Sequence, residues 1–140
     1  MDKKNLTTKE TFELAIQNQQ KNNLQAAEML YKEVLITNPK HAPSHNNLGL
    51  VFHAYGNFQK AKSCYEKAIE NQPGYASAHN NLGLISQILG EFQKAINCYQ
   101  KAIEIQPNFT EAHNNLGLVF HALGNFQKAK SCYEKAIQIN

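Results

Sequence analysis

The chain of 140 residues has no tryptophan, no apolar run near the roughly 18–20 residues that a membrane span needs, and no block of like charges. Its 14 basic and 11 acidic residues leave a net charge of +3, and the two signs are interspersed. We therefore expect neither a transmembrane segment nor a nucleic-acid-binding arm. The first residues lead into no apolar segment of the kind that a secretory signal contains, so we expect none.

Cysteine is also scarce. Cys64, Cys98 and Cys132 are the only three, and they are spaced 34 residues apart. Packed helices lie about 10 Å apart, whereas a disulfide needs Cα atoms within about 7 Å. The spacing therefore predicts three reduced, buried thiols and a cytoplasmic location.

The usual catalytic and cofactor motifs are missing as well. The sequence contains no glycine-rich phosphate loop, no nucleophile elbow and no acid pair that stands out from surface charges. His45, His79 and His113 recur one period apart, and this spacing does not bring three ligands to within about 2–2.2 Å of one metal ion. We expect no enzymatic activity, no metal and no cofactor in these residues.

What the chain does contain is a repeated segment. The residues His45–Tyr65 read HNNLGLVFHAYGNFQKAKSCY, and closely similar segments start at His79 and His113. A constant step of 34 residues is the signature of a repeat array. The expected organisation is a tail and four units, the last of which stops before its closing proline: 1–7, 8–41, 42–75, 76–109 and 110–140.

Local signals predict two helices in each unit. Thr7 and Glu10 have the spacing of a capping box, which marks a helix start. Gly56 suits the left-handed end of a helix, and Asn57 suits the cap of the next one. Pro39 ends the first unit because proline does not continue a helix. Asn22 and Asn23 are expected to end one helix and cap the next in the first unit, as Gly56 and Asn57 do in the second.

Small residues inside the helices predict close contacts. A glycine in mid-helix costs about 1 kcal/mol relative to alanine, so its presence indicates that a neighbouring group comes close. The glycines concerned are Gly49, Gly83 and Gly117, and we expect Ala61, Ala95 and Ala129 to face them. Ser86 replaces an aromatic residue of the other copies, which predicts looser packing at that point.

These positions resemble the tetratricopeptide repeat family. His45-x2-Leu48-Gly49-x2-Phe52, Ala61-x3-Tyr65 and Pro73 fit its pattern, with histidine in place of the usual tryptophan. Residues 8–41 fit more loosely. The resemblance implies an all-α fold, a right-handed α-solenoid of about four helix–turn–helix hairpins, whose first helices line a concave face.

The NNLG motif is further similar to the asparagine-rich repeats of O-linked N-acetylglucosamine transferase, in which asparagines of the first helices grip the backbone of an extended peptide. That resemblance points to Asn47, Asn81 and Asn115. Together with neighbours at helical spacing, the candidate peptide-binding residues are Asn46, Asn47, Leu50, His53, Asn80, Asn81, Leu84, Gln87, Asn114, Asn115, Leu118 and His121.

Plainer interpretations compete with this one. An asparagine on a helix can be solvated or can bond to its own loop, and Leu50, Leu84 and Leu118 can pack between repeats instead of meeting a ligand. The lysine and arginine clamp that holds acidic tails in some family members has no counterpart on this face.

The sequence therefore predicts a protein–protein interaction module that binds an extended peptide or partner segment in its groove. The alternative is an architectural array that self-associates through the uncapped C-terminal helix, as part of a longer protein with an enzymatic domain elsewhere. Neither prediction identifies the partner.

Overall fold

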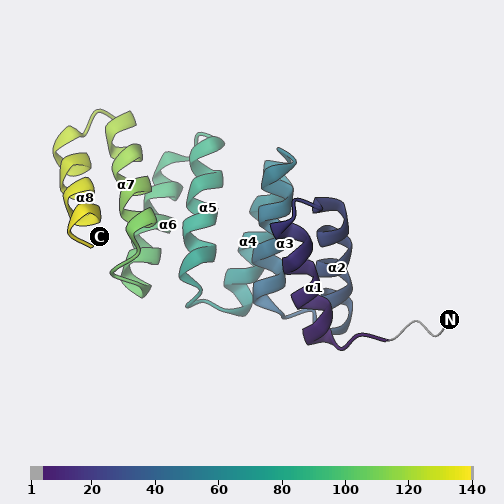
Figure 1. Cartoon of the computed structure of the whole chain (residues 1–140). Helices are drawn as coiled ribbons and strands as arrows, with labels where there is room; N and C mark the ends of the chain where they lie inside the picture. Colours follow the sequence, from purple (N-terminus) through teal and green to yellow (C-terminus); the bar gives the residue numbers. More distant parts are fainter. Residues whose placement is uncertain (1–4, 140) are drawn as a thin grey trace. The chain divides into compact units, whose positions relative to one another are not determined.

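A computed structural model describes residues 5–139, and the chain divides into two compact units, Met1–Gln72 and Pro73–Asn140. The described residues form eight α-helices and no strand (Figure 1). Unit 1 contains α1 (Thr8–Gln20), α2 (Leu24–Thr37), α3 (Ala42–Ala54) and α4 (Phe58–Asn71). Unit 2 contains α5 (Ala76–Ile88), α6 (Phe92–Ile105), α7 (Thr110–Ala122) and α8 (Phe126–Ile139). Consecutive helices pair into hairpins, so the predicted all-α fold of helical hairpins is confirmed.

The turn inside each hairpin contains one residue in the left-handed region. Gly56, Gly90 and Gly124 have φ values of 74°, 78° and 78°, and Asn22 has φ of 62°. After Gly56 the backbone N–H of Asn57 donates to the carbonyl of the residue five positions earlier, at 2.9 Å. This is the bond of a Schellman motif, which satisfies a carbonyl at the helix end. The predicted turn positions are confirmed.

The starts of α1 and α4 are capped by side chains in two different ways. At α1 the Thr7 side chain accepts from the N–H of Glu10, and the Glu10 carboxylate accepts from the N–H of Thr7 at 2.8 Å, which confirms the capping box. At α4 the Asn57 side chain accepts from the N–H of Lys60 at 3.2 Å. Asparagine at this position thus satisfies one of the free N–H groups of the first turn.

The prediction for Asn23 is wrong. Its side chain makes no cap bond to α2 and instead donates from Nδ2 to Asn18 Oδ1 at 3.4 Å. The physical reason is the orientation of the amide: Asn23 points its NH2 group at Asn18 across the turn, and its Oδ1 accepts no bond from the first turn of α2. The start of α2 therefore lacks a side-chain cap.

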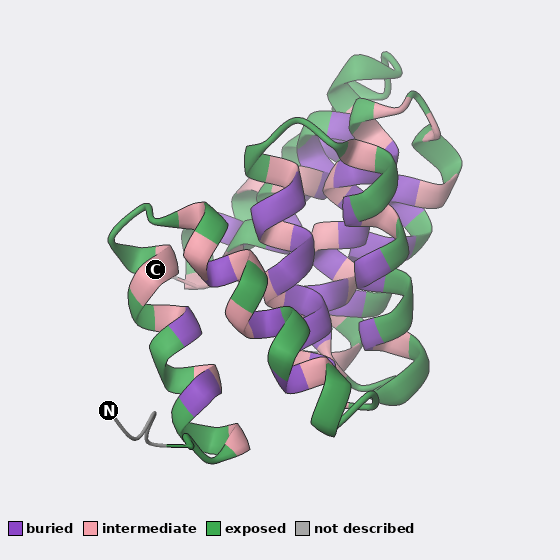
Figure 2. Ribbon diagram, turned by 90° about the vertical axis from the view of Figure 1, so that its right-hand side faces the viewer, coloured by how far each residue is buried: buried purple, intermediate pink, exposed green. Residues whose placement is uncertain are grey.

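Tyrosine rings fill the space between the helices of each hairpin. A Cβ on Gly49 would lie 2.5 Å from Cε1 of Tyr65, and one on Gly83 would lie 2.7 Å from Cε1 of Tyr99. The glycines therefore mark close contacts, as predicted, but the approaching group is an aromatic ring and not the expected alanine. Figure 2 shows that buried residues gather on the facing sides of the helices.

Hairpins within unit 2 pack through an apolar cluster. Ala95, Ile96 and Tyr99 of α6 contact Leu116 and Val119 of α7. Cys132 of α8 belongs to the same cluster, and Ile103 and Phe120 pack against it. Burial of such apolar surface is the main favourable contribution to stacking one hairpin on the next.

Each repeated histidine is bound to the loop before its helix. His45 Nε2 donates to the carbonyl of Pro39 at 2.8 Å, and the same bond joins His113 to Pro107 at 2.9 Å. His79 bonds to Pro73 in the same way at 2.8 Å. In the described part of the chain, no three histidine, cysteine or acidic side chains come together as metal ligands would.

All three cysteines are free and buried, as predicted. Burial raises the pKa of Cys64 to about 11, against smaller opposite effects of Lys67, Lys32 and Lys60. A buried thiol of raised pKa is a weak nucleophile, so Cys64 acts as a small apolar core residue. None of the helices in residues 5–139 has the length and apolarity needed to cross a bilayer.

Candidate peptide-binding face

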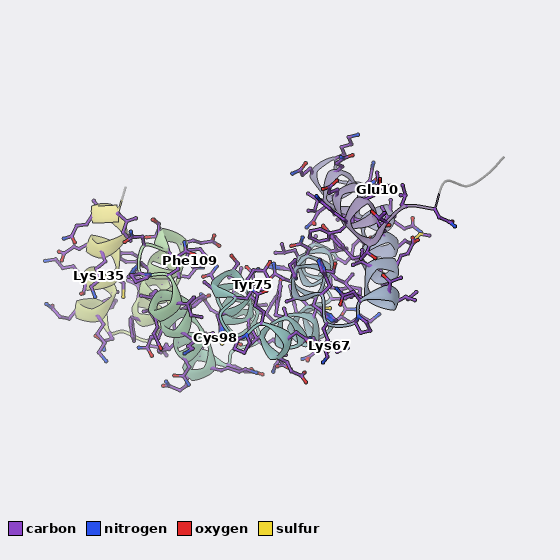
Figure 3. All side chains as sticks on the ribbon, turned by 90° about the horizontal axis from the view of Figure 1, so that it is seen from below. Glu10, Lys67, Tyr75, Cys98, Phe109 and Lys135 are labelled. Atoms are coloured by element: carbon purple, nitrogen blue, oxygen red, sulfur yellow. The ribbon has the colours of Figure 1, made fainter. Side chains whose placement is uncertain are left out.

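The predicted site residues all lie on the first helices of hairpins. In unit 1 they are Asn46, Asn47, Leu50 and His53 on α3. In unit 2 they are Asn80, Asn81, Leu84 and Gln87 on α5, and Asn114, Asn115, Leu118 and His121 on α7. Figure 3 labels Tyr75 and Phe109 where α5 and α7 begin, and Cys98 and Lys135 on the second helices.

In unit 1 the first asparagine of the motif is buried. Asn46 is 4% exposed and donates from Nδ2 to Asn47 Oδ1 at 3.3 Å. His53 is half-buried, and its ring meets the ring of Phe58 edge-on at a centroid distance of 5.7 Å. Of the four predicted residues, Asn47, Leu50 and His53 retain partly exposed side chains.

In unit 2 three polar side chains form a connected chain of hydrogen bonds, which we call the amide bridge. Asn115 Nδ2 donates to Asn80 Oδ1 at 3.1 Å, and Asn80 Nδ2 donates to Glu111 Oε1 at 3.2 Å. Asn80 is only 1% exposed, so it links α5 to α7 from inside the packed surface. A buried amide that is paired at both ends holds its partners in place.

The amide bridge shows that asparagines of the NNLG motifs have different roles. The first one, Asn80, is buried and structural, whereas Asn115 is half-buried and reaches back to the preceding repeat. Asn114 is exposed, so the plainer interpretation of a solvated asparagine applies to this residue. Sequence reasoning missed the bridge because its bonds join residues in different repeats, although the recurrence of paired asparagines was the available signal.

A second polar contact joins α5 to α6. Tyr99 Oη donates to Gln87 Oε1 at 2.9 Å, which leaves the NH2 of Gln87 as a donor. Burial raises the pKa of Tyr99, with smaller contributions from Cys98 and Glu111, so this hydroxyl stays protonated. Where histidine replaces glutamine, as at His53, the Tyr65 hydroxyl is buried with no hydrogen-bond partner among the described residues.

Apolar side chains remain exposed on the same first helices, α5 and α7. Leu118 is 51% exposed and Ile88 is 44% exposed, whereas Leu84 is half-buried. The inter-repeat contact of α7 is made by Leu116 and Val119 instead. The interpretation of Leu118 as a packing residue is therefore not supported by its environment, and its surface is accessible.

The face carries almost no charge in unit 2. Histidine aside, Glu111 is the only acidic or basic residue of α5 and α7, and the lysines of this unit lie on α6 and α8. Their side chains make local contacts, such as Lys101 Nζ with Glu104 at 3.2 Å and Lys128 Nζ over the ring of Phe120 at 5.3 Å. The arrangement thus offers amide donors and acceptors, one carboxylate and apolar surface.

Family models match most of the chain. A tetratricopeptide repeat model matches residues 42–75 and 110–140, another tetratricopeptide repeat model matches 64–97, and a TPR repeat model matches 88–124. Together they span residues 42–140. The chain therefore belongs to the tetratricopeptide repeat family, whose fold is generally a protein-interaction module. The models do not distinguish the asparagine-rich subtype.

Several solved structures share the fold. A crystal structure of MamA aligns with a TM-score of 0.87 at 26% identity, covering 95% of this chain and 78% of MamA. MamA from Desulfovibrio magneticus RS-1 aligns with a TM-score of 0.84 at 21% identity, covering 95% of this chain and 75% of that one. A solved structure of pilF from Pseudomonas aeruginosa aligns with a TM-score of 0.88 at 24% identity, covering 95% of this chain and 61% of that one. These similarities establish an all-α solenoid of helical hairpins. No curated protein sequence matches the chain.

Proposed function

We propose that the chain is a non-enzymatic interaction module whose first helices bind an extended peptide segment. The observation that carries this proposal is the amide bridge of unit 2, which joins the two helices that also carry the accessible apolar side chains of Ile88 and Leu118. A cytoplasmic location is part of the proposal, because three free buried thiols favour a reducing compartment.

The chemistry suits a peptide backbone. A side-chain amide both donates and accepts, so it can pair with a peptide N–H or C=O without reading the sequence. Asn115 uses its NH2 group within the bridge, which leaves its Oδ1 as an acceptor, and Gln87 keeps its NH2 group as a donor. The proposal extends the similarity to asparagine-rich repeats, with the difference that Asn80 holds Asn115 in position.

The test compares peptide binding by three forms of the chain. The native chain and a triple variant, Asn47→Ala, Asn81→Ala and Asn115→Ala, are screened against a library of random peptides. A matched triple variant changes exposed asparagines away from this face, Asn71→Ala, Asn97→Ala and Asn108→Ala.

Circular dichroism verifies that all three forms remain helical. Binding that is lost only in the first triple variant supports the proposed face. Equal binding by all forms moves the site elsewhere, and no binding by any form rejects recognition of short peptides.

A second function, self-association through α8, is favoured by a different observation. Ile137 is 72% exposed, whereas Ile103, one repeat earlier, packs against the cluster between α6 and α7. Tyr133 is likewise half-buried, while its counterpart Tyr99 is fully buried. We propose that a second copy covers this face of α8, because such apolar contacts bind the inner hairpins to each other.

Light scattering over a concentration series tests this second function. We expect the native chain to gain mass with concentration and Ile137→Glu to remain monomeric. Ile36→Glu is the matched control, because Ile36 is 80% exposed on α2, away from α8 in the chain. A constant monomer mass for the native chain rejects self-association.

A further inference from the structure

We infer that the face of unit 2 selects a segment with a cationic side chain, lysine or arginine, next to an aliphatic one. This inference rests on the proposed function, since it names the class of peptide that the same face would take. It is carried by one carboxylate, that of Glu111, which forms one end of the amide bridge and lies on the same side of α7 as the exposed Leu118.

Glu111 is held in a fixed place by a buried partner. Its Oε1 accepts from Asn80 Nδ2 at 3.2 Å, and Asn80 is in turn fixed by Asn115. Asn80 is almost fully buried, so the bond to Glu111 reaches outward from the packed surface. The residue Glu111 itself is exposed, and its second oxygen is available to an incoming donor.

The charges on this face indicate whether the ligand should be cationic or anionic. Glu111 is the only residue on α5 or α7 with a formal charge at pH 7, histidine aside. An acidic peptide would therefore meet repulsion on this face and would gain nothing from lysines on α6 and α8. A cationic side chain gains a charge-assisted hydrogen bond to the carboxylate.

The helix spacing sets the pattern of the peptide. Glu111, Asn115 and Leu118 follow at steps of four and three, so they share one side of α7. Seven residues of helix span about 10 Å, at about 1.5 Å per residue. An extended chain advances about 3.3 Å per residue, so the cationic and aliphatic side chains should be about three residues apart.

The repeats themselves indicate that Glu111 is not a general structural element of the hairpin. The equivalent positions carry Lys9, Pro43 and Ser77. Glu111 lies in the first turn of α7, where a carboxylate also interacts favourably with the helix dipole. Its contribution to stability must therefore be measured apart from its contribution to ligand choice.

The experiment is a selection from a nine-residue random peptide library on the whole chain. Three forms are used: native, Glu111→Gln, and the control Glu104→Gln, which removes an exposed carboxylate of α6 paired with Lys101. We expect the native and control forms to enrich lysine or arginine about three residues from an aliphatic residue. Glu111→Gln should keep the aliphatic preference and lose the cationic one.

A selected peptide then gives the size of the effect. It should bind Glu111→Gln about two- to fivefold more weakly, as for an ion pair in water, and the difference should shrink as salt is added. A peptide with its cationic residue changed to alanine should bind both forms equally. Thermal unfolding of each free form separates loss of stability from loss of recognition.

The outcomes separate the two proposals. Peptide binding without a cationic preference, with an acidic preference, or with a cationic preference that survives in Glu111→Gln overturns this inference and leaves the proposed face standing. If no form binds any peptide, the proposed function fails and the inference fails with it.

Discussion

Two buried hydroxyls show how strongly the environment of a single residue decides its contribution to the stability of the fold. Ser44 and Ser86 are both inaccessible to solvent, but Ser44 Oγ lies 2.7 Å from His41 Nδ1, whereas Ser86 Oγ has no partner in residues 5–139. A buried hydroxyl without a hydrogen bond costs free energy, because it has lost its bonds to water. The replacement of an aromatic residue at Ser86 thus leaves an unpaired group without exposing the position to solvent.

We predict that Ser86→Ala raises the free energy of unfolding by about 1 kcal/mol, because it removes the unpaired hydroxyl. Ser44→Ala is the matched substitution and should lower the free energy of unfolding by about the same amount, since it breaks a hydrogen bond. Urea unfolding followed by circular dichroism measures both. Equal effects of the two substitutions would contradict the prediction.

The cap of α3 is a histidine, which makes it sensitive to pH. His41 Nδ1 accepts from the N–H of Ser44 at 3.2 Å, and this requires the neutral ring. Burial lowers the pKa of His41 below its usual 6.5, with a smaller contribution from His45. A lowered pKa means that the folded chain binds this proton less readily than the unfolded chain does.

The predicted consequence is a loss of stability in acid. The contribution of His41 is present above pH 6.5 and is lost as the pH falls below that value. His41→Asn keeps a capping side chain that does not titrate, so its unfolding midpoint should fall less between pH 8 and pH 5. Parallel pH curves for the two forms would rule out this role of His41.

At the scale of the helix, the glycine–tyrosine contact sets how closely a hairpin closes. Gly83→Ala should lower the free energy of unfolding by about 1–3 kcal/mol through overpacking, even though alanine favours the helix by about 1 kcal/mol. The new methyl would meet the ring of Tyr99, which is fully buried and has no room to move. Chemical denaturation measures the loss.

Two other glycines provide the controls. Gly117→Ala should lower the free energy of unfolding by less, because the facing Tyr133 is only half-buried and its ring can shift. Gly74→Ala should not lower the free energy of unfolding through overpacking, because no neighbouring group lies within 4 Å of the added methyl. If all three variants were equally stable, the ring contact would not be what keeps these positions as glycine.

The elements were predictable from the sequence because their signals are local. The capping box of Thr7 and the left-handed turn at Gly56 depend on residues a few positions apart, and both are confirmed. The cap expected from Asn23 fails because its amide is turned toward Asn18, to which it donates. The ring opposite Gly49 could not be identified from spacing alone, because Ala61 and Tyr65 are one turn apart on the same side of α4, and the structure places the Tyr65 ring at the contact.

The candidate site was only partly predictable. The period of 34 residues places Asn115 on the correct helix, but its bond to Asn80 depends on the distance between two packed helices and on the rotamers of both amides. The difference between the buried Asn80 and the half-buried Asn115 depends on that geometry. Their use in binding remains a prediction.

At the scale of the whole molecule, burial is uneven along the chain. The middle hairpins have many buried residues on their first helices, whereas α1 buries only Thr11 and Ala15 and α8 buries only three of its residues. In arrays of repeats each hairpin contacts only its neighbours, so the outer helices have fewer partners. Opening should therefore begin in α1 and α8.

Amide hydrogen exchange tests this order. We predict that amides in the middle of α3 and α5 exchange at least about tenfold more slowly than those in the middle of α1 and α8, because local opening requires less free energy where fewer side chains are buried. Exchange at one common rate in all eight helices would show that the chain opens as a single unit.

The histidine bonds to the proline carbonyls have a consequence for how such a gene can change length. His113 and Pro107 lie within one period of 34 residues, as do Gly117 and Tyr133, so each contact is copied complete when a whole period is copied. Unequal recombination that adds or removes a whole period would leave every such contact intact. An insertion or deletion of any other number of residues would separate the partners. Selection would then act against a chain whose hairpin lacks these contacts.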